Sequence, residues 1–270
     1  MNVLKDFGGI RISEANGVAT IVLSRSDAYN TLTLELISDI TDCLEKIDSA
    51  DSTRVIILAA EGKAFSTGHD LKEIKQNNNK LFLNELFTKC SNMMMLIKQI
   101  RQPVIAQVQG IATAAGCQLV ASCDLVIASE EAKFATNGIN NGLYCATPSV
   151  ALSRAIKPKH ALEMLLLGDF IDATRAAELG LVNRVVASTL LQRETQNLVR
   201  QLVSKSQYAL QLGKRSFYEQ IGLEIERAYE KTSDQLISNI LSLDGQEGIE
   251  AFTQKRKPNW VSSKKEDKNP

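Results

Sequence analysis

The sequence predicts an α/β fold, because short apolar runs typical of strands alternate with segments of helical periodicity. Residues 55–60 (VIILAA) are apolar throughout, which is the pattern of a strand covered on both faces. Apolar residues recur every three to four positions over residues 32–47 and 83–97, as amphipathic helices require. After about residue 188 the pattern is helical only. We therefore expect strand–helix units followed by a helical C-terminal part.

The first expected elements are a hairpin and a helix. Residues 10–23 are expected to form two strands joined at Asn16-Gly17, a pair that suits a tight hairpin turn. The first helix follows, with Thr31 or Thr33 as its N-cap.

The middle of the chain is expected to continue with a loop at residues 61–69 and a helix from about Leu71. Met93 and Met94 lie on the apolar stripe of the 83–97 helix, and such a stripe is typical of a core rather than of a cofactor site. Further strands are expected near residues 104–108, 125–128 and 182–186, and glycines are expected to interrupt the C-terminal helices at Gly213, Gly222 and Gly248.

The charge balance excludes some classes of partner. Basic and acidic residues both number 31, so the net charge is zero and no global field favours nucleic acid or a membrane surface. No run of about 18 apolar residues predicts a membrane-spanning helix. The N-terminal residues show neither a signal-peptide core nor a transit-peptide composition. We therefore expect a cytoplasmic protein, or a mitochondrial-matrix protein if a transit peptide is missing from this sequence.

The sequence also lacks the motifs of several enzyme classes. It has no P-loop, no GxSxG elbow and no GxGxxG after a strand. Its five cysteines form no CxxC pair, and with two histidines a zinc site is not expected. We therefore expect free thiols, and neither a metal nor a separate cofactor.

Residues 103–129 carry the most informative pattern. A strand-like run ends at Gln109-Gly110, small residues follow, and a helix begins among them and continues to about Ser122. Small residues let another group approach the backbone closely, and N–H groups at a helix start attract negative charge. This segment therefore predicts an anion or oxyanion site made of main chain.

Six motifs follow one another along the chain. They are LSRSDAYNTL (23–32), AFSTGHDLKEI (64–74), GIATAAGCQLVASCDL (110–125), FATNGINNGL (134–143), EMLLLGDFIDATRAAELGLVNRVV (163–186) and EGIEAFTQKRKPNW (247–260). With these motifs in this order, the chain resembles the crotonase, or enoyl-CoA hydratase/isomerase, superfamily from about residue 8 to 260, and most closely its hydratase-like "domain-containing" members.

The resemblance implies a crotonase-like spiral of ββα turns with a C-terminal helical trimerisation segment. Residues 1–200 would form the core with a CoA-thioester site, residues 201–262 the oligomerisation segment, and residues 263–270 a disordered tail. The implied ligand is an acyl-CoA thioester, with no cofactor beyond its CoA moiety. The implied assembly is a homotrimer or a dimer of trimers.

In this family two backbone N–H groups hold the thioester oxygen, and they match Ser66 and Ala115. Donors that are fixed before the reaction favour an enolate over the ground-state carbonyl. The resemblance therefore gives the main-chain site at residues 103–129 a specific ligand.

The resemblance also implies where CoA binds, with basic side chains near its phosphates and main-chain groups along its pantetheine and adenine. The implied positions are Arg25, Ala28, Asn30, Thr67, Gly68, Asp70, Leu71 and Lys72, together with Lys255, Arg256 and Lys257 near the C-terminus. The Lys-Arg-Lys run is preferred among the cations, because a cluster suits phosphate. The family has proline after Arg25, whereas this chain has Ser26.

Two positions depart from the hydratase pattern. Gln118 and Gly138 stand where two glutamates of hydratases activate water and deliver a proton. Glutamine exchanges no proton near neutral pH, and glycine has no side chain. Each positioned acid or base contributes about 10²–10⁴-fold. We therefore expect little enoyl-CoA hydration, and no isomerisation that relies on an acid at position 138.

His69 leaves a second reaction open, because a histidine at this point also occurs in malonyl-type CoA decarboxylases of the superfamily. Alternatively, its side chain is hydrogen-bonded at a helix start.

Tyr144 and Cys145 could line the acyl pocket and act on the substrate, or form a buried inert pair. Asp124 is expected only as a turn residue. The sequence thus favours a hydratase-like carbon–oxygen or carbon–carbon lyase, with a malonyl-type CoA decarboxylase or a catalytically silent acyl-CoA-binding protein as alternatives.

Overall fold

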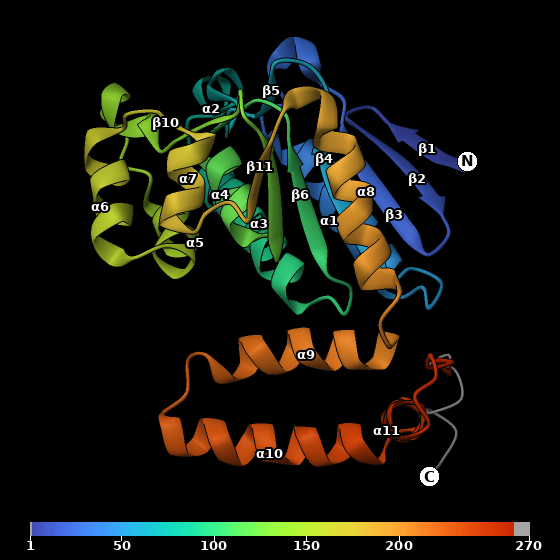
Figure 1. Cartoon of the computed structure of the whole chain (residues 1–270). Helices are drawn as coiled ribbons and strands as arrows, with labels where there is room; N and C mark the ends of the chain where they lie inside the picture. The colour runs from blue at the N-terminus through green and yellow to red at the C-terminus, as the bar shows by residue number, and fades with distance from the viewer. Residues whose placement is uncertain (1, 262–270) are drawn as a thin grey trace.

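The computed structural model describes residues 2–261, and the tail predicted at residues 263–270 lies outside them. Two sheets organise this part of the chain (Figure 1). The larger sheet contains, in spatial order, β1 (Asn2–Phe7), β2 (Ile10–Ala15), β3 (Val18–Leu23), β4 (Val55–Ala60), β6 (Val104–Val108), β8 (Leu125–Ser129) and β11 (Arg184–Val186). The smaller sheet contains β10 (Ile171–Asp172), β9 (Lys133–Ala135), β7 (Ile111–Thr113) and β5 (Ala64–Ser66). The prediction of an α/β fold is confirmed.

The helices follow and separate these strands. In the described residues they are α1 (Leu34–Asp48), α2 (Leu71–Gln76), α3 (Lys80–Gln99), α4 (Ala115–Ser122), α5 (Ala146–Ala155), α6 (Pro158–Leu167), α7 (Ala173–Leu179), α8 (Leu191–Val203), α9 (Gln207–Gln220), α10 (Ile225–Leu241) and α11 (Leu243–Thr253). Short 3-10 segments are η1 (Ser26–Ala28), η2 (Asn137–Asn141) and η3 (Ser188–Leu190).

The predicted hairpin and first helix are confirmed. β2 and β3 pair antiparallel, with Ile10 opposite Leu23. Asn16 and Gly17 have φ values of 52° and 75°, the left-handed conformation that a type I′ turn needs. Thr33 caps α1 by accepting a hydrogen bond from the Leu36 N–H.

The larger sheet is covered by helices on both faces. β3, β4, β6, β8 and β11 run parallel, with α8 on one face and α1 and α3 on the other (Figure 1). Ile57 of β4 packs with Leu198 and Val199 of α8, whereas its neighbours Ile56 and Leu58 belong to the core on the opposite face. The fully apolar run of β4 thus reflects burial from both sides.

The structure also corrects the sequence prediction at several points. The smaller sheet was not predicted, because strands of two or three residues are too short to show alternation, and β5 lies within the expected loop. Of the three glycines predicted to interrupt the C-terminal helices, Gly213 and Gly248 lie inside α9 and α11. Gly222 does lie between two helices, α9 and α10. Met93 and Met94 are buried in the core, as predicted.

The last three helices extend away from the two sheets (Figure 1). α8 still packs on the larger sheet and runs to Val203, and it therefore crosses residue 200, where the core was expected to end. Within the described chain, α10 contains no buried residue. The C-terminal helices α9 to α11 are therefore attached to the core and not embedded in it.

Candidate functional site

The turn between β7 and α4 places a helix start beside the smaller sheet. Ala114 has a φ of 50°, and its N–H donates to the Ala135 carbonyl of β9 at 2.9 Å. The Gln118 N–H donates to the Ala114 carbonyl at 3.0 Å and closes the first turn of α4. No side chain among the described residues caps this helix. The first N–H groups of α4 therefore have the arrangement that an anion site requires.

Two glycines allow β5 and the loop after it to contact this helix start. A Cβ atom at Gly116 would clash with the carbonyl oxygen of Ser66. A Cβ atom at Gly68 would lie 3.0 Å from the nitrogen of Ala115, and Gly68 also has a φ of 83°, which favours glycine. The structure thus brings Ser66 and Ala115 together, as their predicted roles need.

The loop after β5 is held by hydrogen bonds to the segment after η1. The Ser66 hydroxyl donates to the Asn30 carbonyl at 2.8 Å, and the Gly68 N–H donates to Ser66 Oγ at 3.3 Å. The Leu32 N–H donates to the Gly68 carbonyl at 2.8 Å. The backbone around Ser66 is therefore fixed by the protein itself, which is the condition for a preorganised donor.

Gln118 lies one turn beyond Ala115, so both residues share a face of α4. Gln118 is 4% exposed, and its Oε1 atom has no hydrogen-bond partner among the described residues. Thr136, which follows β9, is fully buried, and its Oγ1 likewise has no partner there. An unsatisfied buried polar group costs about 1–3 kcal/mol, so both atoms suit a polar group of a ligand or a water. Thr136 lies in the FATNGINNGL motif, but it was not among the predicted site residues.

The surroundings of Gly138 leave no room for a side chain. A Cβ atom there would lie 2.5 Å from the Leu143 carbonyl oxygen and 2.9 Å from Cys145 Sγ. Cys145 is buried, whereas Leu143 and Tyr144 are about half exposed. Burial raises the pKa of the Cys145 thiol, although the Gly138 N–H acts to lower it. The space that a glutamate side chain at position 138 would need is thus occupied by the Leu143 main chain and the neutral thiol of Cys145.

His69 lies in the same loop as Ser66 and packs edge-on against Phe87, with ring centroids 5.3 Å apart. Neither ring nitrogen makes a hydrogen bond of normal geometry within the described residues, although the main chain of Leu32 lies nearby. Burial lowers the pKa of His69, so the ring is neutral at pH 7. Asp70, and not His69, caps α2, by accepting from the Lys72 N–H at 2.9 Å.

Several residues predicted to bind CoA have structural partners. Arg25 Nη1 donates to Thr33 Oγ1 at 2.9 Å. The Asn30 amide donates to the carbonyls of Glu61 at 2.9 Å and Ala64 at 2.8 Å, and so ties two loops together.

The remaining predicted positions near α2 are closer to the surface. The Ala28 carbonyl accepts from the Thr31 N–H at 3.1 Å, and the Thr67 N–H donates to the Tyr29 carbonyl at 3.2 Å. Leu71 and Lys72 are exposed at the start of α2. Lys72 is therefore the predicted cation that is most accessible beside the loop of Ser66.

The Lys255–Lys257 run does not reach this loop within one chain. It follows α11, which lies at the opposite end of the molecule from α2 and β5 (Figure 1). Arg256 is also engaged, because its guanidinium contacts both carboxylate oxygens of Glu247, at 2.6 and 2.8 Å. Contact of this run with CoA phosphates therefore stays a prediction, and within one chain the run lies far from the loop after β5.

Among residues 2–261, the remaining chemical groups form no second reactive centre. All five cysteines are free and buried, and burial raises the pKa of Cys117 to about 12. In the described residues, no group of three or more His, Cys, Asp or Glu side chains could hold a metal ion. Nor does the described chain contain a helix that is long and apolar enough to cross a membrane.

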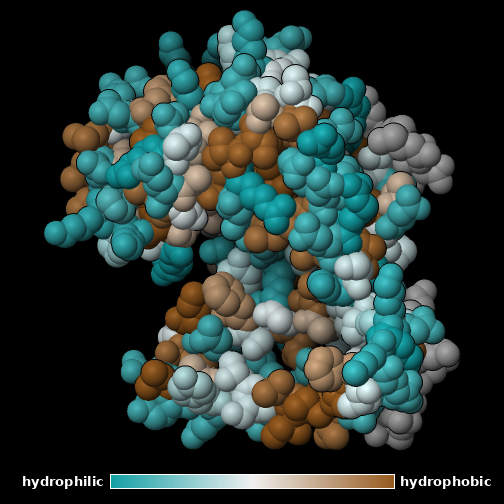
Figure 2. All heavy atoms as spheres, viewed as in Figure 1, coloured by the Kyte–Doolittle hydropathy of each residue, from teal (hydrophilic) through white to brown (hydrophobic). Residues whose placement is uncertain are grey.

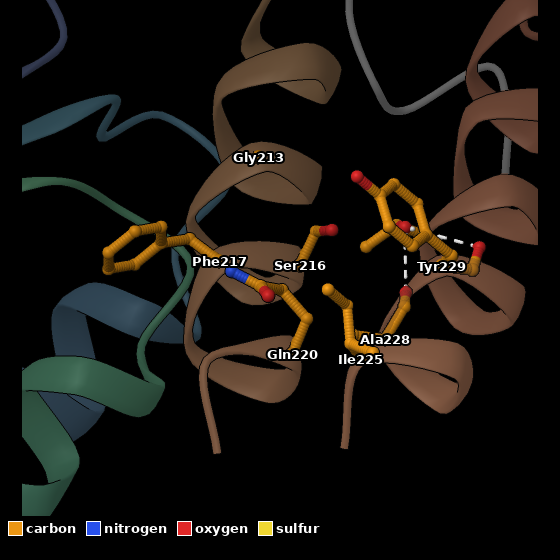
Figure 3. Close-up of a pocket in the computed structure, with 8 residues that line it drawn as sticks. Gly213, Ser216, Phe217, Gln220, Ile225, Ala228 and Tyr229 are labelled. Carbon is orange, nitrogen blue, oxygen red and sulfur yellow. Dashed lines mark hydrogen bonds between the residues drawn. The ribbon is translucent and has the colours of Figure 1, made fainter. Parts of the chain in front are cut away.

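An open groove of about 480 Å³ lies between α9 and α10, away from β5 and α4. Ser216 and Gln220 of α9 face Ile225 and Ala228 of α10 across it (Figure 3). Because this groove contains neither an ionisable cluster nor any predicted site residue, we do not consider it the site of chemistry.

Comparison with known proteins identifies the relatives of this chain. The sequence model of the family described as enoyl-CoA hydratase/isomerase matches residues 13–263. Human enoyl-CoA hydratase domain-containing protein 3, which is named as mitochondrial, is 46% identical over 248 residues, covering 92% of this chain and 82% of that protein.

Solved structures give the same result. The crystal structure of an enoyl-CoA hydratase from Mycobacterium smegmatis has a TM-score of 0.92 at 43% identity, and the match covers 93% of this chain and 98% of that one. The crystal structure of the human domain-containing protein 3 has a TM-score of 0.91 at 44% identity, covering 93% and 100%. These matches confirm the predicted resemblance and the crotonase-like fold.

Proposed function

Since the chain belongs to the enoyl-CoA hydratase/isomerase family, we propose that it binds an acyl-CoA thioester and stabilises its enolate with the N–H groups of Ser66 and Ala115. The observation that carries this proposal is the close contact of β5 with the start of α4, which only a glycine at position 116 permits. Backbone donors fixed in this way need no reorganisation when negative charge develops.

Hydration of enoyl-CoA is proposed to be slow. Gln118 supplies no proton, and a side chain at Gly138 would collide with the Leu143 carbonyl. Two missing acid–base groups, each contributing about 10²–10⁴-fold, leave little of an ordinary hydratase rate. Enolate stabilisation without a carboxylate is the chemistry that this site retains.

The test is to mix the purified chain with crotonyl-CoA and follow the enoyl absorbance, which should fall slowly. Turnover at an ordinary hydratase rate would contradict the proposal. A mass-spectrometric screen against a panel of CoA thioesters then identifies the acyl group that is converted. Ser66→Pro, which deletes the donor, should abolish this conversion. Ser66→Ala is the matched control, since it keeps the N–H and loses only the two hydrogen bonds of the hydroxyl, to the Asn30 carbonyl and from the Gly68 N–H.

Decarboxylation of a malonyl-type CoA thioester is a second candidate, favoured by His69. Its buried neutral ring has both nitrogens free of normal hydrogen bonds among the described residues, so one N–H is available to a carboxylate. Loss of carbon dioxide leaves an enolate and needs no base. If methylmalonyl-CoA and ethylmalonyl-CoA release no carbon dioxide with the purified protein, this candidate is excluded.

A catalytically silent acyl-CoA-binding protein is the remaining alternative, and it is favoured by the filled space at Gly138. Calorimetry separates it from the enzymes, because it would bind thioesters without converting any member of the panel. Absence of binding would exclude all three functions.

We also propose a homotrimer or a dimer of trimers, assembled through the C-terminal helices. Apolar side chains gather on the surface of these helices (Figure 2). Those of α10 include Ile225, Tyr229, Leu236, Ile237, Ile240 and Leu241. Contiguous apolar surface of this kind marks an interface. Native mass spectrometry that finds only monomers would contradict this.

The proposed location is the mitochondrial matrix, which was the alternative to the cytoplasm. The support is the name of the human relative, which is described as mitochondrial. Fractionation of cells that express the natural gene tests this directly, and protein found only in the cytosolic fraction would contradict it.

A further inference from the structure

A partly buried polar cluster around Asp124 joins α9 to the core. The ammonium of Lys214 lies 2.7 Å from Asp124 Oδ2, and its side chain is 6% exposed. The ammonium also donates to the carbonyls of Ile97 at 2.7 Å and Gln102 at 2.8 Å. Tyr218, one turn further along α9, donates its hydroxyl to Asp124 Oδ1 at 2.8 Å. Both carboxylate oxygens are thus bonded to α9.

Burial makes the members of this cluster depend on one another. Burial lowers the pKa of Lys214, and the carboxylate of Asp124 acts in the opposite direction. Burial and the same carboxylate both raise the pKa of Tyr218. A buried charge that loses its partner is strongly destabilising. Removal of any one of the three side chains is therefore expected to weaken the contacts of the other two.

Apolar packing does little to fix the position of α9. Leu212 is the only buried residue of this helix in the described structure, and Phe217 is half exposed. At the start of the helix, Gln207 Nε2 donates to the Asp51 carbonyl at 3.3 Å. The hydrogen bonds around Asp124 therefore attach the middle of α9 to the core.

Asp124 is also the residue at which the far end of α4 is fixed. It follows α4, its N–H donates to the Val104 carbonyl at 3.0 Å, and its Oδ2 accepts from the Val104 N–H at 2.7 Å. All residues of α4 are buried, and a helix of this length extends about 12 Å. The other end of the same helix carries the Ala115 N–H.

α4 thus connects two fixed points. At its start, Gly116 lies against the Ser66 carbonyl, and at its end Asp124 binds the side chains from α9. Close-packed elements transmit a displacement rather than absorb it. A shift of Asp124 would therefore change the position of the Ala115 N–H.

We infer that Lys214, Tyr218 and Asp124 are positioning residues for the thioester site: they fix the far end of α4 and thereby the N–H of Ala115. This inference rests on the proposed function. It means that attachment of the C-terminal helices, and not the core alone, sets how strongly the site favours a negatively charged thioester oxygen.

Tyr218→Phe is the most informative variant, because it removes one hydrogen bond to Asp124 and keeps the ring, over which Lys98 Nζ lies 5.5 Å from the centroid. Calorimetry on the whole chain measures the affinities for acetoacetyl-CoA, which readily forms an enolate, and for free CoA. We expect the ratio of these affinities to fall about 10- to 100-fold, since one donor is displaced, while free CoA binds as before. Tyr208→Phe, at a tyrosine of the same helix α9 that is not part of the Asp124 cluster, is the matched control and should keep the ratio.

The outcomes separate this inference from the proposed function. An unchanged ratio in Tyr218→Phe, with a wild type that prefers acetoacetyl-CoA, overturns the inference and leaves the proposed function standing. An equal loss of both affinities shows a merely structural role and also overturns it. A wild type without preference for acetoacetyl-CoA overturns both. Lys214→Met is the second variant, and Tyr218→Phe decides alone if Lys214→Met does not fold.

Discussion

The core and the C-terminal helices use similar amphipathic sequences in different ways. α1 and α10 have 15 and 17 residues, and both carry apolar side chains at helical spacing. Leu36 and Ile40 of α1 are buried against the sheet, whereas Leu236, Ile240 and Leu241 of α10 are exposed. The pattern therefore identifies a helix in both regions, but only in the core does the same chain supply the surface that covers it.

The way in which the two regions are held differs accordingly. The core is held by apolar packing, and the C-terminal helices are attached through polar groups that include those around Asp124. Substitutions of the same kind should therefore have different effects in the two regions, and the following predictions are ordered by the size of the expected effect.

The largest effect is expected for Lys214→Met at the junction of the two regions. It leaves the Asp124 carboxylate, whose side chain is 13% exposed, without its cation, and breaking a pair of this kind costs up to about 3–5 kcal/mol of unfolding free energy. Lys231→Met is the control, because Lys231 pairs with Glu219 at the surface, where such pairs contribute about 0–1 kcal/mol. Urea unfolding of both variants checks this, and similar losses would show that the junction does not depend on the buried pair.

A matched pair of leucines tests the apolar contrast. Leu36→Ala, at a residue 1% exposed, should lower the unfolding free energy by about 2–5 kcal/mol through the cavity that it leaves. Leu241→Ala, at a residue 71% exposed, should change it by less than about 0.5 kcal/mol in the monomer and weaken self-association. Denaturation and native mass spectrometry measure the two effects. If Leu241→Ala leaves the oligomeric state unchanged, α10 is not the interface.

A matched pair of glycines tests the backbone contacts. Gly116→Ala forces a methyl group against the Ser66 carbonyl and should destabilise the protein by about 1–3 kcal/mol and impair thioester binding. Gly213→Ala, inside α9 with nothing within 4 Å of the added Cβ, should stabilise it by about 0.5–1 kcal/mol. Thermal unfolding compares the two. Normal thioester binding by Gly116→Ala would argue against the contact on which the site depends.

The smallest expected effect concerns His69. The folded-state pKa of His69 is lowered by burial, so the unfolded chain binds more protons as the pH falls below about 6.5. Its contribution to stability is therefore complete above that pH and is lost as the pH falls through the folded pKa, at no more than about 1.4 kcal/mol per pH unit. His69→Asn should therefore flatten the pH dependence of urea unfolding below about pH 6.5. Parallel curves for His69→Asn and wild type would contradict this.

Where the sequence succeeded, a long local pattern was sufficient. The run at β4, the spacing along α1 and α3 and the Asn16-Gly17 turn each identify their element without knowledge of the rest of the chain. The smaller sheet was missed because its strands have two or three residues, and Gly213 was misjudged because a helix tolerates one glycine at a modest cost.

The features of the site that lie within one short segment could be predicted from the sequence, whereas those that join distant residues could not. The small residues before α4 predict a main-chain site, and the close approach of Ser66 to Gly116 is what such residues allow. In contrast, the filled space at Gly138 depends on Cys145 seven residues later, and the role of Asp124 depends on Lys214 and Tyr218, about 90 residues away. Such long-range contacts leave no periodicity in the sequence.

The most direct test of the central claim is the ultraviolet difference spectrum of acetoacetyl-CoA when it binds to the purified protein. A site with fixed N–H donors at Ser66 and Ala115 should favour the negatively charged form of this ligand. We therefore predict that the enolate absorption band grows on binding, at a pH at which the free ligand is mainly neutral. A bound ligand that keeps the spectrum of the neutral form would contradict the oxyanion site.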